Sequence, residues 1–369
     1  MLSMILVAGG LLAAGTSSDH IQGGSATFTL RAEHLRLYGN QVIENGIVKV
    51  ENGKVTYAGD AKGAGELGHD VIEHKGWASP GLVAARTRSG LSGDTLEPKR
   101  PMTAQARAAD VLSLEHADFR RARSEGITTM VVTLSPANVA SGLSAVVKTD
   151  GATMVEREAH LQLGLSADAL RNNRYPTSYG AALELIEGEL SKPTGVWERA
   201  ATGKLPVMLD AVSRDEIQRA LALAGEYKLK GVLTRAPLAG ELAADVRKSG
   251  LGVIVGPFGF GTEQRLLDSV TALGRERVPL AFGLESPDWP EASLRISAAL
   301  CVRAGLDATM AWEGLTTTAA ALAGVGARVG KLAPGYDADI VLWNGDPLEL
   351  SSRAVTVFIG GVRHDGGAH

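Results

Sequence analysis

The sequence is poor in the residues that metal and redox centres need. Cys301 is the only cysteine in 369 residues, so an internal disulfide and a cysteine metal cluster are both excluded. Its apolar setting, RISAALCVRAGL, predicts a small buried side chain on a helix. The eight histidines are His20, His34, His69, His74, His116, His160, His364 and His369. No two are spaced to share one face of a strand or helix, so we expect them in loops or at the surface.

A basic block and a membrane-spanning run are also missing. The formal net charge is -4 and the pI about 6.1, which argues against nucleic acid and anionic membranes as partners. The apolar and glycine stretch from Met4 to Gly15 is shorter than the ~20 residues that cross a bilayer. We therefore expect no membrane span.

That N-terminal stretch has the layout of a secretory signal peptide. Small residues end the apolar run and polar TSSDH follows, although no lysine or arginine precedes the run. The pattern predicts a leader over residues 1–25 and a periplasmic or secreted protein. The alternatives are a misassigned start codon or a buried strand, with a cytoplasmic location.

Both ends of the chain carry strand patterns. IVKVENGKVTYAG alternates on either side of Asn52-Gly53, which indicates a β-hairpin, and Asn45-Gly46 predicts a second turn. From Gly330 onward, turn-separated strands follow one another with no helix between them. The pattern predicts one β-sandwich domain built from residues 26–78 and 330–369.

Between these ends, over residues 79–329, short apolar strands alternate with helices. Ser213 and Glu216 form the pattern of a capping box at the start of a helix. A second helix is predicted in ELAADVRKSG and is expected to end at Gly250. Strands such as LPVMLDAV and GVLTRA are apolar on both faces, as in parallel sheets. The repetition predicts an α/β fold with a (β/α)8 TIM-like barrel, a fold of roughly 250 residues, inserted into the β-sandwich.

Three stretches resemble the amidohydrolase superfamily, particularly imidazolonepropionase-like and related exported amidohydrolases. They are ENGIVKVENGKVTYAG…SPGLVAARTRSG, DFRRARSEGITTMVVTLSPANVASGLSAVVKTDG and LTTTAAALAGVGARVGKLAPGYDADIVLWNGDPLE. The resemblance extends from about Phe28 to Asp365. It implies hydrolysis of C–N bonds by water that zinc or another divalent metal activates at the C-terminal mouth of the barrel.

The residues that would bind this metal differ from the family pattern. Where the family has two histidines on the first barrel strand, SPGLVAARTRSG offers Arg86 and Arg88. A guanidinium group has no lone pair to donate and repels a cation. Arg235 in GVLTRA stands at another histidine position.

Only two of the corresponding positions could donate an oxygen. These are Asp210 in LPVMLDAV and Glu285 in LAFGLESP, which stands where the family has its catalytic aspartate. We therefore expect no metal and no other cofactor. Lys148 resembles the carboxylated lysine that bridges two metals in some relatives, but without histidine ligands we expect a solvated or ion-paired lysine.

Arginines and carboxylates at one mouth can pair directly. Such fork-like pairs would form an ionic plug in place of the metal, although desolvation offsets much of their attraction. Three arginines and two carboxylates would leave one guanidinium free for a small anionic ligand. In RNNRYPTSYG, the side chains of Arg171, Arg174 and Tyr175 are candidate contacts at the rim.

The favoured interpretation is a catalytically inactive superfamily member with a structural, regulatory or ligand-binding role. Its partner would be a catalytic amidohydrolase paralogue or a second copy of itself. One alternative is an active C–N hydrolase that uses Asp210 and Glu285, with an oxygen-ligated ion or with metal-free acid–base chemistry; arginine neighbours would keep such a carboxylate ionised, as a base requires. Another alternative is an anion-binding module that uses Arg86, Arg88 and Arg235.

Overall fold

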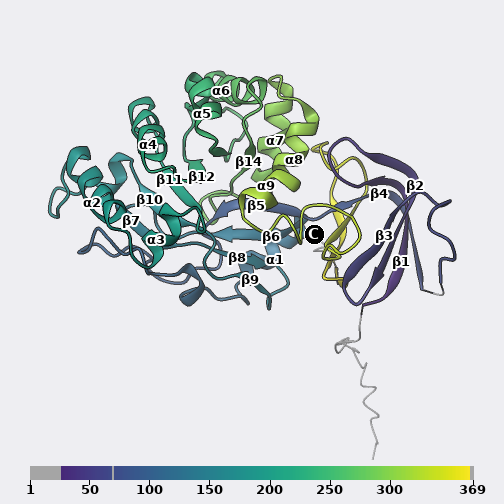
Figure 1. Cartoon of the computed structure of the whole chain (residues 1–369). Helices are drawn as coiled ribbons and strands as arrows, with labels where there is room; N and C mark the ends of the chain where they lie inside the picture. Colours follow the sequence, from purple (N-terminus) through teal and green to yellow (C-terminus); the bar gives the residue numbers. More distant parts are fainter. Residues whose placement is uncertain (1–25, 69, 366–369) are drawn as a thin grey trace, which may run out of the picture.

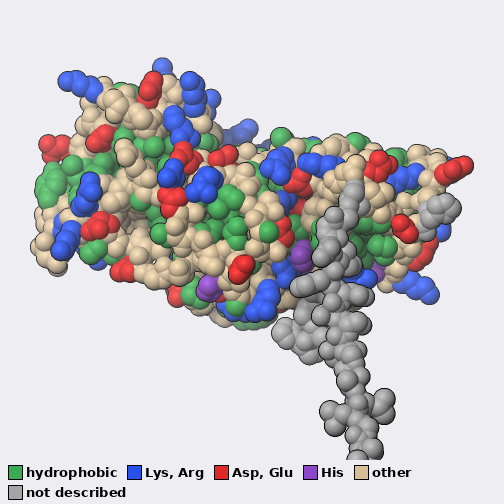
Figure 2. Space-filling view, turned by 90° about the horizontal axis from the view of Figure 1, so that it is seen from below, with side chains coloured by type: hydrophobic (Ala, Val, Ile, Leu, Met, Phe, Trp, Pro, Cys, Tyr) green, Lys and Arg blue, Asp and Glu red, His purple; other side chains and the backbone are tan. Residues whose placement is uncertain are grey.

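A computed structural model describes residues 26–68 and 70–365 (Figure 1). The predicted leader over residues 1–25 lies outside the described residues. Within the described part of the chain, no helix has the length and apolar character needed to cross a membrane. On the face shown in Figure 2, basic and acidic side chains are intermixed over the surface and do not form separate regions.

Strands from both ends of the described chain form one mixed sheet, at the right of Figure 1. The order across this sheet is β17-β16-β15-β4-β1-β2-β3. Its strands are β1 (Phe28–Arg36), β2 (Val42–Glu51), β3 (Lys54–Gly59), β4 (Val71–Pro80), β15 (Ile340–Trp343), β16 (Ala354–Ile359) and β17 (Val362–Asp365). The antiparallel pairing of β15 with β4 joins the N-terminal strands to the C-terminal ones.

This sheet is curled, and it replaces the two sheets of the predicted sandwich. A Cβ atom on Gly53, at the β2–β3 turn, would lie 2.5 Å from the carbonyl oxygen of Gly360, at the β16–β17 turn. Two turns at opposite ends of the strand order therefore touch. Inside the curl lies a separate apolar core that includes Leu30, Leu35 and Phe358.

The hairpin prediction is confirmed and the second turn is wrong. Asn52 and Gly53 both have positive φ, 53° and 73°, as a tight hairpin turn requires. Asn45-Gly46, in contrast, lies within β2, where Gly46 pairs with Ala32 of β1. The glycine is needed there because a Cβ atom would lie 2.4 Å from the side chain of Leu35.

The middle of the chain forms two further sheets. The larger has the order β14-β13-β12-β11-β10-β7 and the smaller β5-β6-β8-β9. Their strands are β5 (Leu82–Thr87), β6 (Ile127–Val132), β7 (Ala140–Leu143), β8 (Ala145–Lys148), β9 (Met154–Glu156), β10 (Leu161–Gly164), β11 (Val207–Asp210), β12 (Gly231–Thr234), β13 (Gly252–Val255) and β14 (Leu280–Phe282). Strands β10 to β14 are parallel to one another, and β5 is parallel to β6.

Helices connect these parallel strands. They are α1 (Ala117–Ser124), α2 (Tyr179–Ser191), α3 (Val196–Ala201), α4 (Arg214–Glu226), α5 (Ala243–Ser249), α6 (Gln264–Arg275), α7 (Ser293–Arg303), α8 (Ala308–Leu315) and α9 (Thr317–Leu322). Short 3-10 turns cover η1 (Ala108–Asp110), η2 (Ala167–Ala169) and η3 (Ala239–Leu242). Two predicted helix signals are confirmed: the capping box of Ser213 with Glu216 at α4, and Gly250 in the left-handed conformation after α5.

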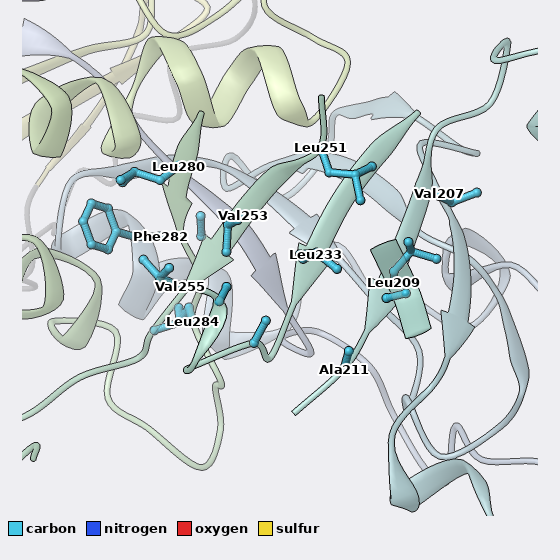
Figure 3. Close-up of a cluster of buried hydrophobic side chains, with 14 of the residues drawn as sticks. Val207, Leu209, Ala211, Leu233, Leu251, Val253, Val255, Leu280, Phe282 and Leu284 are labelled. Atoms are coloured by element: carbon cyan, nitrogen blue, oxygen red, sulfur yellow. The ribbon is translucent and has the colours of Figure 1, made fainter. Parts of the chain in front are cut away.

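Side-chain alternation along the strands separates two apolar layers. Val207, Leu209 and Ala211 belong to the large core that packs against the helices (Figure 3). Met208, between them in sequence, belongs to a smaller core with Val83 and Val232 on the opposite face. The parallel strands are therefore buried on both faces, as their continuous apolar runs predict.

The two sheets adjoin each other at two places. The amide of Leu284, just after β14, donates to the carbonyl of Arg86 in β5 at 2.7 Å. At the second place, the Gln162 side chain of β10 accepts a hydrogen bond from the amide of Leu134, just after β6, at 2.9 Å. The mixed α/β class is confirmed, but the described strands alone do not establish a closed eight-stranded barrel.

Candidate functional site at the strand ends

The five residues singled out from the sequence all lie at the carboxyl ends of parallel strands. Arg86 is the penultimate residue of β5 and Arg88 follows that strand. Asp210 ends β11, Arg235 follows β12, and Glu285 lies three residues after β14. Carboxyl ends of parallel strands face one edge, so these side chains can meet although up to 199 residues of sequence separate them.

An irregularity in β5 turns Arg86 toward the other site residues. Its neighbours two and four positions earlier, Ala84 and Leu82, belong to the layer against the helices. The pairing of β5 with β6 shifts register between Ala84 and Thr87. Strict alternation along β5 would turn the Arg86 side chain toward the helices. Because of the irregularity, Arg86 instead lines a small cavity together with Asp210.

Each arginine of the site is paired with a carboxylate. Arg86 forms an ion pair with Glu285, and Arg88 pairs with Asp288. The Arg88 Nε atom also lies 3.9 Å from Glu285 Oε2. Glu285 therefore joins Arg86 to Arg88, and Asp288 is a partner that the sequence did not single out.

Arg235 links Asp210 to a second additional carboxylate. Its guanidinium donates to Asp168 at 2.5 Å and to Asp210 Oδ1 at 3.4 Å. Ser166 also donates to Asp210 Oδ1, at 2.8 Å. Arg235 has a positive φ of 52°, an uncommon conformation for a residue other than glycine. Side-chain pairing thus fixes this arginine at a strained point of the chain.

We call these seven residues the strand-end cluster: Arg86, Arg88, Asp168, Asp210, Arg235, Glu285 and Asp288. Three guanidinium groups face four carboxyl groups in it. The expectation of one unpaired arginine is therefore wrong, because Asp168 and Asp288 supply the missing charges from loops that follow the strands. Adjacency in the fold, which no sequence spacing reveals, brings these two residues to the site.

Burial dominates the electrostatics of the cluster. Burial lowers the pKa of the Arg86 guanidinium to about 10, with Asp210 opposing the shift and the other two arginines adding to it. Burial also raises the pKa of the Asp210 carboxyl, although Arg235, Arg86 and Ser166 act in the opposite direction. The expectation that neighbouring arginines would favour an ionised carboxylate is overturned for Asp210, because desolvation is the larger effect.

The donor set does not fit the divalent metal that the resemblance implies. Zinc needs several neutral nitrogen, thiolate or carboxylate ligands that converge on one point. Asp210 and Glu285 are the only such groups among the five residues, and arginines stand beside both. Within the residues that the structure describes, no group of three or more His, Cys, Asp or Glu side chains is arranged to hold an ion.

Lys148 lies away from the strand-end cluster, in an ion-paired cluster of its own. Its ammonium pairs with Asp339 and lies 3.1 Å from Asp337 Oδ2. Lys54 and Arg328 contact Asp337 at 2.5 and 3.2 Å. This junction cluster (Lys54, Lys148, Arg328, Asp337 and Asp339) connects β8 to the chain that enters β15, and it confirms the ion-paired interpretation of Lys148.

Three other residue predictions can be compared with the structure. His160 lies in a loop, as expected, but it is not at the surface: it is 1% exposed, and its ring nitrogens contact Ser144 Oγ at 3.0 Å and the Leu322 carbonyl at 2.8 Å. Of the three candidate rim residues, Arg174 and Tyr175 contact other side chains. Arg174 donates to Asn138 Oδ1 at 2.7 Å, and the exposed Tyr175 contacts Glu184 at 3.3 Å. Cys301 is buried on α7, as expected.

Known proteins resemble this chain over different extents. A family model described as Amidohydrolase family matches residues 243–363. An imidazolonepropionase from Klebsiella pneumoniae is 35% identical over 116 residues, which cover 30% of this chain and 28% of that protein. The chain thus matches well under two thirds of that relative's length.

Two further similarities extend over most of the molecule. An imidazolonepropionase from Sphingopyxis alaskensis is 25% identical over 85% of this chain and 90% of that protein. The crystal structure of an amidohydrolase from Thermotoga maritima aligns with a TM-score of 0.80 and 22% identity, covering 91% of this chain and 99% of the other; this likeness concerns the fold. The family model and the relatives support the amidohydrolase superfamily, and the solved structure agrees with them in fold.

Proposed function

We propose that this chain is a catalytically inactive amidohydrolase-superfamily protein in which an ionic plug takes the place of a metal centre. Its two middle sheets form the superfamily's barrel, over residues 79–329. The curled sheet is a composite domain of residues 26–78 and 330–369. The strand-end cluster closes the mouth of that barrel.

The observation that carries the proposal is the position of Arg86. Its side chain is 4% exposed, pairs with Glu285 and lines the same cavity as Asp210. A cation bound by these two carboxylates would have to displace a buried guanidinium from between them. Removing one partner from a buried ion pair costs about 3–5 kcal/mol, so metal binding would begin with that penalty.

An inactive barrel with a stable ionic plug suits a structural or regulatory role. A catalytic amidohydrolase paralogue or a second copy of this chain is the partner that we propose, in the periplasm or outside the cell. The pairing of all three arginines disfavours the anion-binding alternative, because an anionic ligand would compete with four carboxylates for them. Asp210 and Glu285 have no free guanidinium between them to stabilise an oxyanion.

The names of the relatives favour one competing function, an active hydrolase of a cyclic C–N bond. Purified protein separates the two. We expect less than a tenth of an equivalent of zinc or other divalent metal after mild dialysis, and no hydrolysis of cyclic amides or imidazolones. Stoichiometric metal together with turnover would refute the proposal.

A double variant tests the position of the plug. Arg86→His/Arg88→His supplies two imidazoles beside Asp210 and Glu285, and we expect it to bind about one equivalent of zinc without recovering activity. Arg275→His/Arg277→His is the matched control, because these two exposed arginines have the same spacing at the end of α6. Equal zinc uptake by both variants would show that the strand-end geometry is not responsible.

A further inference from the structure

A small cavity lies beneath the strand-end cluster. It leaves about 10 Å³ to the centre of a water-sized molecule. Its lining includes Arg86, Asp210, Thr234 and Ser141, of which the last three come from β11, β12 and β7. A space of this size holds one water molecule and no larger ligand.

Three buried polar atoms of this lining are left without a protein partner. Asp210 Oδ2, Thr234 Oγ1 and Ser141 Oγ have no hydrogen bond to any residue that the structure describes. Their residues are 3%, 2% and 5% exposed. Buried polar atoms are nearly always paired with protein or with ordered water, so three unpaired ones around a single cavity require an explanation.

We propose that one ordered water molecule occupies this cavity and bridges Asp210 to the hydroxyl groups of Thr234 and Ser141. Water donates to Asp210 Oδ2 and accepts from a threonine or serine hydroxyl, which gives it the two to four partners that a buried water typically has. The proposal goes beyond the inactive function and does not depend on it.

The charges around the cavity favour water over an ion. Arg86 lines the cavity and Arg235 lies 3.4 Å from Asp210 Oδ1, so a second cation would be repelled. Asp210 itself, with Asp168 beyond Arg235, repels an anion. A neutral molecule that both donates and accepts hydrogen bonds satisfies all three atoms.

The water links strands that do not all pair with one another. β11 pairs with β12, but β10 separates β11 from β7. A bridge from Asp210 and Thr234 to Ser141 therefore connects three strands, beside the Gln162 side chain that joins the two sheets. It also gives Asp210 Oδ2 a hydrogen-bond donor, while Arg235 and Ser166 donate to Oδ1.

Two isosteric Thr→Val variants test the water bridge, because they are expected to change Tm in different directions. Thr234→Val removes a hydroxyl that the water needs, and we expect Tm to fall by about 1–3 °C. Thr129→Val is the matched control: Thr129 is also buried with an unpaired hydroxyl, but it does not line the cavity. Losing an unpaired hydroxyl should leave Tm unchanged or raise it. An equal rise in both variants would refute the proposal.

A high-resolution crystal structure provides the second measurement and needs no variant. We expect one density peak within hydrogen-bond distance of Asp210 Oδ2 and of at least one hydroxyl. An empty cavity, or a rearrangement in which a protein group donates to Asp210 Oδ2, would refute the proposed water molecule. An anomalous peak after a rubidium soak would identify a cation site and refute it as well. Neither measurement uses zinc content or turnover, so this proposal can fail independently of the inactive function.

Discussion

The strand-end cluster and the junction cluster each surround buried carboxylates, and they differ in how completely the hydrogen bonds of those carboxylates are made. In the junction cluster, every carboxylate oxygen contacts a donor. Asp337 forms ion pairs with Lys54, Lys148 and Arg328. Asp339 forms an ion pair with Lys148 and accepts a hydrogen bond from the Gly360 amide at 3.0 Å. In the strand-end cluster, Asp210 Oδ2 has no protein partner.

This difference separates a structural role from a site that can still bind something. A fully paired cluster is closed to ligands, because any new contact must break an existing one. The strand-end cluster pairs its charges but keeps unpaired acceptor and hydroxyl capacity in a cavity below them. Within one chain, the incomplete cluster is therefore the better candidate for a site that binds a molecule, even if that molecule is water.

The largest expected effect concerns the centre of the junction cluster. Lys148→Met leaves Asp339, 4% exposed, with a single amide donor and no cation, and we expect it to lower the free energy of unfolding by about 3–5 kcal/mol in urea titrations. Lys54→Met is the control. Lys54 is 46% exposed, so its removal should cost about 1 kcal/mol or less.

Equal losses in these two variants would contradict a structural role for the buried lysine. A double variant strengthens the test: Lys148→Met/Asp339→Leu removes both charges, and it should recover part of the loss because an apolar pair of similar volume needs no desolvation.

A smaller effect is expected at the strand-end cluster. Arg86→Met leaves Glu285 without its buried partner, but that carboxylate is 20% exposed and Asp210 keeps its contact with Arg235. We therefore expect the free energy of unfolding to fall by roughly 2–3 kcal/mol in the same titration. Arg88→Met, which removes an exposed pair with Asp288, should cost about 1 kcal/mol or less. The two arginines lie two residues apart, so a similar loss in both would argue against a buried plug centred on Arg86.

Local rules of sequence recover much of the fold and the positions of the site. The hairpin at Asn52-Gly53, the capping box at Ser213 and the helix end at Gly250 each depend on a few neighbouring residues, and the structure has all three. The resemblance to the superfamily identifies which strand ends carry the site. Arginine and carboxylate at those ends suffice to predict that they pair.

Partners from distant loops could not be predicted in this way. Asp168 and Asp288 reach the arginines because η2 and the loop after β14 adjoin the strand ends, and nothing in their local sequence marks them. The junction cluster pairs Lys148 with Asp339, 191 positions away. The hydroxyls of Ser141 and Thr234 resemble any other strand residue until the cavity between them is known.

The third prediction is that the stability contributed by Asp210 and that contributed by Asp337 change in opposite directions as pH changes. Burial raises the pKa of Asp210, so its contribution to stability is present below the ordinary aspartate pKa and is lost as pH rises. At Asp337, burial acts in the same direction, but hydrogen bonds from Lys54 and Lys148 with Arg328 nearby outweigh it and lower the pKa. Its contribution is present above the ordinary value and is lost as pH falls.

Unfolding titrations of the wild type, Asp210→Asn and Asp337→Asn between about pH 3 and pH 7 measure both signs, around the ordinary aspartate pKa of about 3.9. Subtracting each variant from the wild type cancels the titration of the groups common to both. The stability difference for Asp210→Asn should decrease as pH rises, and that for Asp337→Asn should decrease as pH falls. Parallel slopes would contradict the distinction, because they would mean that burial and pairing act alike on the two carboxylates. Opposite slopes would show that the cationic partners of Asp337 offset its burial, whereas those of Asp210 do not.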